Sequence, residues 1–328
     1  MRPGGMMGDA NEHFLPIPAK EATVRRHALT LLILGFLFAS APTGRGQDKE
    51  KDKEAFDKAV VEIKKIGGKL EVDMKEKNRP LIGVDFAGTE VVDLQLPLLK
   101  PLPDLKKLSL RKTKITDNGL EHLKSLTQLQ KLDLSGMRIS DNGIEFLEGL
   151  VNLVELDLSE TDMTNVGARW LKGMTKLQVL NLANTRTAMT NSSIEYFKNM
   201  SYLHTLNLRG AAITEFGVDY LKDHYRMVNL DLGNTRIGDD GLESFKKMIK
   251  LKSLDLRGTQ ITDKGLAHLT KSLSLRVLYL NGTGITDAGL ERIKEIKYLE
   301  EVYLNITKVT DKGVKNLQQA VPRLKIVR

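Results

Sequence analysis

The sequence of 328 residues contains no cysteine. This absence excludes disulfide bonds, thiolate metal sites, a cysteine nucleophile and a lipid-anchored cysteine. A chain without disulfides depends on a large apolar core for its stability, and a chain of this length can supply one. The sequence therefore predicts a protein held together by side-chain packing.

Catalytic motifs are missing as well. The sequence has no H-E-x-x-H, no G-x-S-x-G, no G-x-G-x-x-G and no Walker pattern. His122 and His268 occupy the same place in two repeats that lie far apart along the chain, so they are not expected to meet. We therefore expect no enzyme activity, no metal site and no cofactor.

Long runs of one charge are also missing. The formal net charge is +8, from 50 Lys and Arg against 42 Asp and Glu, yet the two signs are interleaved along the whole chain. A nucleic-acid-binding protein usually gathers its basic residues into a patch or an arm. The pattern indicates a mixed, solvated surface and no nucleic-acid partner.

The one long apolar run lies near the N-terminus, from Ala28 to Ala41, behind Arg25 and Arg26. Its 14 residues are too few for a comfortable transmembrane helix, which needs about 20. Residues 1–46 are therefore interpreted as a prefix and a secretory signal, cleaved after Ala41 or at the Gly46–Gln47 bond. An uncleaved anchor stays open. The expected location is extracytoplasmic (secreted, periplasmic or cell envelope), with no membrane insertion after cleavage.

Residues 47–80 are predicted to form a charged linker and an N-terminal cap. The stretch "QDKEKDKE" has the composition of a solvated linker. After it, Phe56, Val60, Ile63 and Ile66 share one face of a predicted amphipathic helix. A hairpin-like strand follows over residues 70–74. Such a cap would cover the apolar end that a repeat array exposes.

Residues 81–328 repeat a unit of 24 residues about ten times, as L-x-x-L-x-L-x-x-T-x-I-T-D-x-G-L-x-x-L-x-x-L. The row that begins at Leu177 is two residues longer, and prolines in the first row are expected to spoil its helix. Within a unit, Leu108 and Leu110 alternate as in a strand, whereas Leu120 and Leu123 share a helix face. The recurring Asp, as at Asp117, is predicted to cap that helix, with Thr116 as the alternative.

Stacking these units predicts an α/β fold. Strands lie about 4.8 Å apart, whereas helices need roughly 10 Å, so the stack must curve with the strands inside. The expected architecture is a right-handed curved solenoid with a parallel sheet on the concave face and helices on the convex face. The recurring glycine, as at Gly119 and Gly143, predicts close packing against the neighbouring unit.

These rows resemble the leucine-rich repeat family, whose fold is a horseshoe-shaped solenoid. The I-T-D-x-G-L form is similar to the cysteine-containing subtype of F-box substrate receptors and to bacterial exported leucine-rich repeat proteins. The position that holds Cys or Asn in the family is mostly Thr here, as at Thr113 and Thr259, which implies a ladder of hydroxyls bonded to loop backbone.

The resemblance implies a scaffold that binds proteins. The alternative is an intracellular adaptor of the F-box receptor type, although no F-box-like segment precedes the array. The protein is expected to be a monomer with a protein partner of unknown identity.

A partner is expected on the concave face, where outward strand residues form columns. Neighbouring aspartates there need counter-charges, for which Lys131, Arg209 and Arg257 are available. A self-neutralised polar sheet and a recognition face for a basic or polar protein both stay open. Tyr279, Tyr303 and Arg257 are the favoured anchors. The candidate binding residues are Arg111, Asp133, Asp157, Asn181, Asn207, Arg209, Asp231, Asp255, Arg257, Tyr279 and Tyr303.

Overall fold

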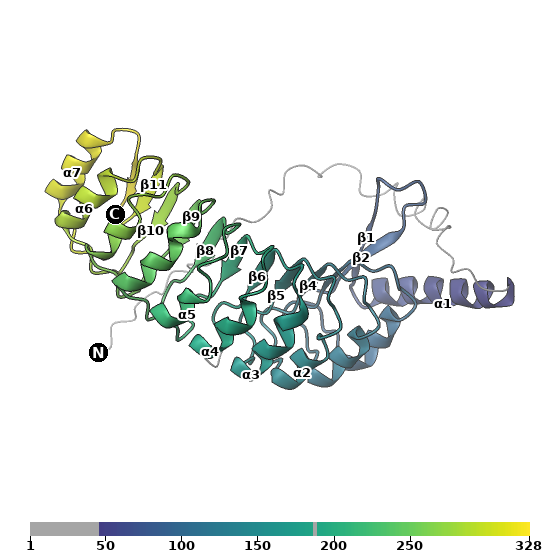
Figure 1. Cartoon of the computed structure of the whole chain (residues 1–328). Coiled ribbons are helices and arrows are strands. Elements are labelled where there is room, and N and C mark those ends of the chain that lie inside the picture. Colours follow the sequence, from purple (N-terminus) through teal and green to yellow (C-terminus); the bar gives the residue numbers. More distant parts are fainter. Residues whose placement is uncertain (1–45, 186–188) are drawn as a thin grey trace, which may run out of the picture.

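A computed structural model describes residues 46–185 and 189–328, and the predicted signal lies outside these residues. The described chain is a curved solenoid, with strands along its concave side and helices along its convex side (Figure 1). Twelve strands form one sheet in sequence order. The predicted α/β solenoid is confirmed.

The strands are β1 (Lys69–Val72), β2 (Leu81–Asp85), β3 (Lys107–Ser109), β4 (Lys131–Asp133), β5 (Glu155–Asp157), β6 (Val179–Asn181), β7 (Thr205–Asn207), β8 (Asn229–Asp231), β9 (Ser253–Asp255), β10 (Val277–Tyr279), β11 (Glu301–Tyr303) and β12 (Lys325–Val327). β1 and β2 pair antiparallel, and the pairs from β2 to β12 are parallel.

The α-helices are α1 (Gly46–Lys65), α2 (Asp141–Glu145), α3 (Asn165–Ala168), α4 (Asn191–Ile194), α5 (Glu215–Asp219), α6 (Asp287–Lys294) and α7 (Asp311–Ala320). The 3₁₀ helices are η2 (Asp93–Leu99), η3 (Asp117–Leu123), η4 (Arg169–Gly173), η5 (Glu195–Phe197), η6 (Asp239–Lys247) and η7 (Gly265–His268). The convex side therefore carries short α and 3₁₀ segments.

The helix of the first repeat corrects a prediction. Its prolines were expected to spoil it, yet η2 forms there with Pro97 inside. Pro97 removes one bond of the segment, but bonds on either side remain: the N–H of Gln95 donates to the carbonyl of Val92 at 3.1 Å, and the N–H of Lys100 donates to the carbonyl of Pro97 at 3.1 Å.

The parallel register places each core leucine beside its equivalent in the next repeat. Leu108 pairs with Leu132, and Leu132 with Leu156. Across the longer repeat, Leu180 still pairs with Leu206, 26 residues on, so the two extra residues leave the sheet register intact. Residues 186–188, where this repeat departs from the others, lie outside the described residues. One hydrophobic core runs through all the repeats.

The N-terminal end of this core is covered, as the amphipathic pattern predicts. Val60 and Ile63 of α1 are buried, Phe56 and Ile66 pack against the core, and β1 pairs with the first strand of the array. Residues 47–54, which the sequence suggests as a charged linker, are helical and belong to α1, and residues 50–54 are exposed. Lys and Glu are good helix formers, and a core-anchored helix extends easily into such a stretch.

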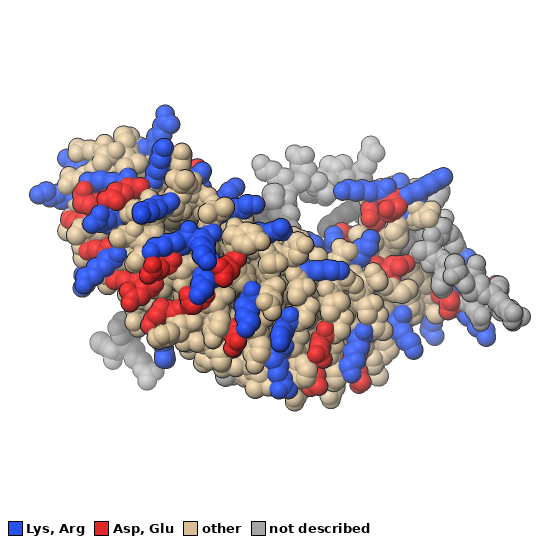
Figure 2. All heavy atoms as spheres, viewed as in Figure 1, with Lys and Arg blue, Asp and Glu red and all other residues tan. Residues whose placement is uncertain are grey.

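Charges of both signs are interleaved over the visible face of the solenoid (Figure 2). Every helix within residues 46–185 and 189–328 is too short or too polar to span a bilayer.

Neighbouring repeats are also joined on the convex side by the recurring Asp, Thr and Gly. Asp141 accepts hydrogen bonds from the N–H of Thr164 at 2.8 Å, from its hydroxyl at 2.7 Å and from the N–H of Gly167 at 2.8 Å, all in the next repeat. Equivalent bonds link Asp117 to Ser140. We call this series of contacts the inter-repeat ladder.

The ladder revises the predicted role of the recurring Asp. The helix is capped by the residue before the Asp, because the hydroxyls of Ser140 and Thr164 accept hydrogen bonds from the N–H two residues on. The glycine is confirmed as a site of close packing, because a Cβ on Gly167 would lie 2.5 Å from Oδ1 of Asp141. Asp, Thr and Gly therefore form one contact between repeats.

Candidate functional site

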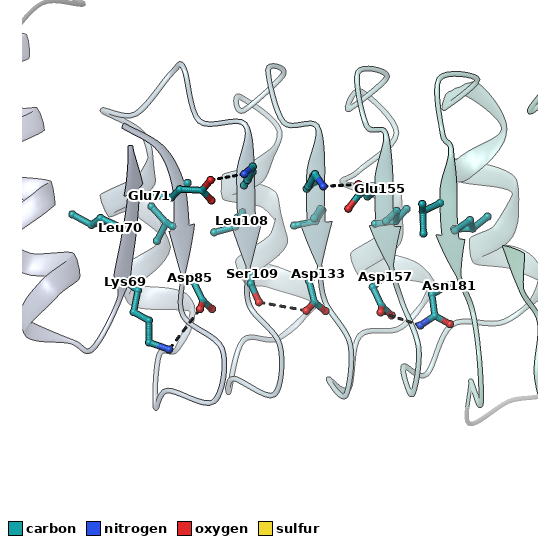
Figure 3. A pocket seen from close by; sticks show the side chains of 18 of the residues that line it. Lys69, Leu70, Glu71, Asp85, Leu108, Ser109, Asp133, Glu155, Asp157 and Asn181 are labelled. Carbon is teal, nitrogen blue, oxygen red and sulfur yellow. Dashed lines mark hydrogen bonds and ion pairs between the residues drawn. The ribbon is translucent and has the colours of Figure 1, made fainter. Parts of the chain in front are cut away.

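From β3 to β11 the concave face is built from strands of three residues, in which the middle side chain is buried and the outer two face away from the core. Figure 3 shows the two resulting rows, one near each end of the strands. Asp85, Ser109, Asp133, Asp157 and Asn181 lie in the row at the carboxyl ends.

A hollow of about 600 Å³ lies over β1 to β7, with Lys69 and Glu71 of the cap hairpin among its lining residues. Lys131 lines this hollow. The sequence suggested it as a counter-charge for the aspartates, but it does not bind them. Its Nζ instead binds Glu155 at 2.5 Å, in the row at the other end of the strands. Lys107 binds Glu71 of the hairpin in the same way.

The row at the carboxyl ends continues through six Asx residues, which we call the Asx row: Asp133, Asp157, Asn181, Asn207, Asp231 and Asp255. Each accepts a hydrogen bond from the backbone N–H two residues on, at 2.8 to 3.1 Å. These side chains therefore fasten the loop that follows each strand. Asn207, Asp231 and Asp255 are also buried.

Within the Asx row, Asp231 and Asp255 lie in register on neighbouring strands. Arg257 donates to Asp255 through Nε at 2.7 Å and also through Nη2, so the predicted counter-charge is present. Burial, together with repulsion from Asp255, raises the pKa of Asp231 to about 6. Burial also raises the pKa of Asp133. These carboxyl groups therefore fasten the loops, although burial makes their ionised form less favourable.

A second hollow of about 270 Å³ lies beside the Asx row, at the carboxyl ends of the strands. Eight of the eleven candidate residues line it: Arg111, Asp133, Asp157, Asn181, Asn207, Arg209, Asp231 and Arg257. The remaining three are Asp255, Tyr279 and Tyr303.

The two tyrosines replace Asp and Asn in the row at the C-terminal end. Their rings stack with centroids 4.5 Å apart and planes inclined by 20°. Arg257 lies 5.1 Å from the centroid of Tyr279, in cation–π contact. The half-buried pair therefore presents a rigid aromatic surface on the concave side.

Two residues of this cluster, Glu301 and Lys325, are not among the candidate binding residues. The hydroxyl of Tyr303 donates to Oε2 of Glu301 at 2.6 Å, which raises the pKa of Tyr303 to about 12. Lys325 binds the same carboxylate at 3.2 Å. Glu301 and Lys325 lie in the row at the amino ends of the strands. Aligning the repeats at the first strand position would have brought these two residues together.

The described residues hold no group of three or more side chains that could bind a metal ion. His224 is buried, its ring nitrogens lie 3.2 Å from the carbonyls of Leu221 and Phe197, and burial lowers its pKa. The concave face is therefore an extended polar surface with an aromatic end.

Comparison with known proteins finds leucine-rich repeats in this chain. One leucine-rich repeat family model matches residues 127–186, and a second matches residues 102–124, 227–246, 247–269 and 271–294. No curated protein matches.

Solved structures share the fold. The ectodomain of the Arabidopsis receptor kinase HAESA, solved with a peptide hormone, aligns with a TM-score of 0.57 at 15% identity over 85% of this chain and 53% of that one. Internalin C2 from Listeria monocytogenes gives 0.52 at 22% identity over 69% and 92%. The internalin InlF of the same organism gives 0.43 at 18% identity over 83% and 94%. The matched repeats and the solenoid together show that the chain carries leucine-rich repeats in the fold typical of them.

Proposed function

We propose that this chain is a non-catalytic scaffold that binds a protein through its concave sheet, with Tyr279, Tyr303 and Arg257 as the main anchor. The stacked tyrosine pair is the observation that carries the proposal. From β4 to β9 the same position holds an Asx residue that fastens its own loop, whereas the two rings have no such task.

The chemistry of this end fits a protein partner. Tyr and Arg are enriched among the residues that dominate binding energy, and a stacked pair loses little side-chain entropy on binding. The polar hollow beside the Asx row would form the rim. The HAESA ectodomain, which has the same fold, is solved with a peptide, so an extended peptide segment of a protein is a suitable ligand class.

The test is a double variant, Arg257→Glu with Tyr279→Ala, used as bait for proteins of the native cells. We expect capture of the partner to fall at least tenfold, since hot-spot residues each contribute about 2 kcal/mol or more. Circular dichroism and thermal melting show whether the variant is folded.

The matched control is Arg226→Glu with Tyr202→Ala. This pair has the same chemistry, with Arg226 4.8 Å from the Tyr202 ring centroid, but Tyr202 lies in the turn before β7. The control is expected to capture the partner normally. Loss in the control with normal capture by the first variant would place binding on that edge and contradict the proposal.

We further propose that the protein acts outside the cytoplasm, because Arg25, Arg26 and the run from Ala28 to Ala41 have the pattern of a secretory signal. The prediction is that N-terminal sequencing of the protein from native cells starts after Ala41 or at Gln47, in an extracytoplasmic fraction. An intact N-terminus in the cytoplasm of a eukaryote would favour the F-box-type adaptor instead.

A further inference from the structure

One edge of the solenoid carries exposed apolar residues in three successive turns. These turns lead from the convex helices into β8, β9 and β10. Tyr225, Ile249 and Leu273 stand four residues before their strands and are 53%, 69% and 69% exposed. Together they form what we call the edge ridge.

The three turns lie side by side. The N–H of Lys252 donates to the carbonyl of Val228 at 2.8 Å, and the N–H of Arg276 donates to the carbonyl of Lys252 at 2.8 Å. In addition, Ser274 Oγ donates to the carbonyl of Ile249. Backbone bonds thus hold the edge ridge as a continuous row.

The same turns are strongly basic. Residues 222–228, 246–252 and 270–276 contain eight Lys and Arg and one acidic residue, Asp223, which is a net charge of +7. Three of these cations bind carboxylates outside the turns: Lys222 binds Asp219, Lys246 binds Glu243 and Arg276 binds Glu300. Asp223 already binds Lys247 at 2.9 Å. Lys250, Lys252 and Lys271 are exposed and form no ion pair with any residue that the structure describes.

The basic character is local to this part of the edge. The equivalent turns of the three repeats around β3 to β6, residues 124–130, 148–154 and 172–178, hold three Lys and one Glu, a net charge of +2. Val151 is the apolar residue at the position of the edge ridge there and is 44% exposed. These turns can therefore serve as a less basic control for the edge ridge within the same chain.

We propose that the edge ridge docks the protein on a lipid surface with anionic headgroups. Apolar tips flanked by cations suit a membrane interface, where the tips enter the acyl boundary and lysines meet phosphates. Lys is depleted at protein–protein interfaces. Single-stranded nucleic acid favours aromatic platforms, whereas two of the three tips are aliphatic. Docking of this kind crosses no bilayer and leaves the concave sheet free.

The first test measures sedimentation of the full chain with vesicles of phosphatidylcholine containing 30% phosphatidylglycerol. We expect Lys250→Ser with Lys271→Ser to weaken binding at least fivefold, and Ile249→Ser with Leu273→Ser at least as much. The charge-matched control, Lys172→Ser with Lys176→Ser, is expected to bind as the wild type does. Residues 28–41 are present in every variant, so the differences report the edge ridge.

The second test uses the absence of cysteine. A polarity-sensitive dye on Leu273→Cys is expected to shift to shorter wavelength with the anionic vesicles and to stay unshifted with pure phosphatidylcholine. The same dye on Val151→Cys is expected to stay unshifted with both.

An unshifted dye at residue 273 on vesicle-bound protein would overturn the proposal. So would equal weakening by the control pair of lysines. Loss of a protein partner in Ile249→Ser with Leu273→Ser, with vesicle binding unchanged, would assign the edge ridge to a protein and likewise overturn it.

Discussion

Replacing Asp141 by alanine is expected to lower the free energy of unfolding by about 3 kcal/mol, although Asp141 is not among the candidate binding residues. Its carboxylate accepts three hydrogen bonds from Thr164 and Gly167 of the next repeat. The side chain of Asp141 is half-buried, and Gly167 is buried. Removal of the acceptor therefore leaves backbone donors without a partner where water reaches them poorly.

Asp141→Asn is the matched control for this change. Asparagine keeps one carbonyl oxygen, and the chain itself uses Asn165 and Asn191 at the equivalent position, where they bind Thr190 and Thr214. We expect a loss of about 1 kcal/mol or less. Urea unfolding of both variants checks the prediction. An equal loss in the two, or none in the alanine variant, would show that the inter-repeat ladder does not stabilise the stack.

The same argument predicts a gain at one junction where the ladder is interrupted. Glu215 and Gly238 stand there in place of Asp and Thr. Gly238 has no hydroxyl, and within the described chain no hydrogen bond joins the Glu215 carboxylate to residue 238. The backbone of Gly238 is extended, and a Cβ would meet nothing within 4 Å. Glu215→Asp with Gly238→Thr is therefore expected to raise the free energy of unfolding by about 1 kcal/mol.

The fold was predictable because its determinants are local and repeated. Leu108 and Leu110 have the spacing of a strand, Leu120 and Leu123 that of a helix, and a period of 24 residues brings equivalent strands together. In a repeat array each unit contacts only its neighbours, so the unit and its period define the fold. The Thr ladder was predictable for the same reason, and Thr259 indeed donates to the carbonyl of Leu256.

Contacts between repeats were harder to predict. Asp117 is placed as well for capping its own helix as for reaching Ser140, and only the stacking distance decides between them. The charged start of α1 has the composition of a linker, and it is helical because its far end is anchored by Val60 and Ile63. In both cases tertiary structure selects among local conformations that the sequence allows.

The candidate site also has features that the sequence predicts and features that depend on tertiary structure. The column of side chains and the tyrosine pair follow from strand periodicity. The burial of Asn207, Asp231 and Asp255 depends on side chains that cover them, and the periodicity carries no information on that cover. The bond from each Asx residue to its own loop could have been suggested by the Asx preference for turns.

Asp231→Asn is expected to stabilise the protein by about 2 kcal/mol at pH 7. Burial and the charge of Asp255 raise the pKa of Asp231 to about 6, so keeping it ionised in the folded state costs free energy. Asparagine carries no charge and keeps the oxygen that accepts from the N–H of Gly233 at 2.8 Å. Asn181 and Asn207 already serve in this way in the Asx row.

The gain should depend on pH. A carboxyl with a raised pKa binds protons more readily in the folded state than in the unfolded state, so its cost is present above pH 6 and is lost as the pH falls towards 4. The stability of the wild type should therefore approach that of Asp231→Asn over this range. Thermal or urea unfolding at pH 7, 6, 5 and 4 measures the difference.

Asp85→Asn is the control for this pH dependence. Asp85 accepts from the N–H of Ala87 at 2.8 Å just as Asp231 does from Gly233, but its side chain is 43% exposed and its register partner on β3 is Ser109. The Asp85 side chain is therefore solvated and has no carboxylate as its register partner, so its replacement should change stability little at any of these pH values. A gain in Asp231→Asn that stayed constant from pH 7 to pH 4 would contradict this account, because only the ionised carboxyl carries the cost.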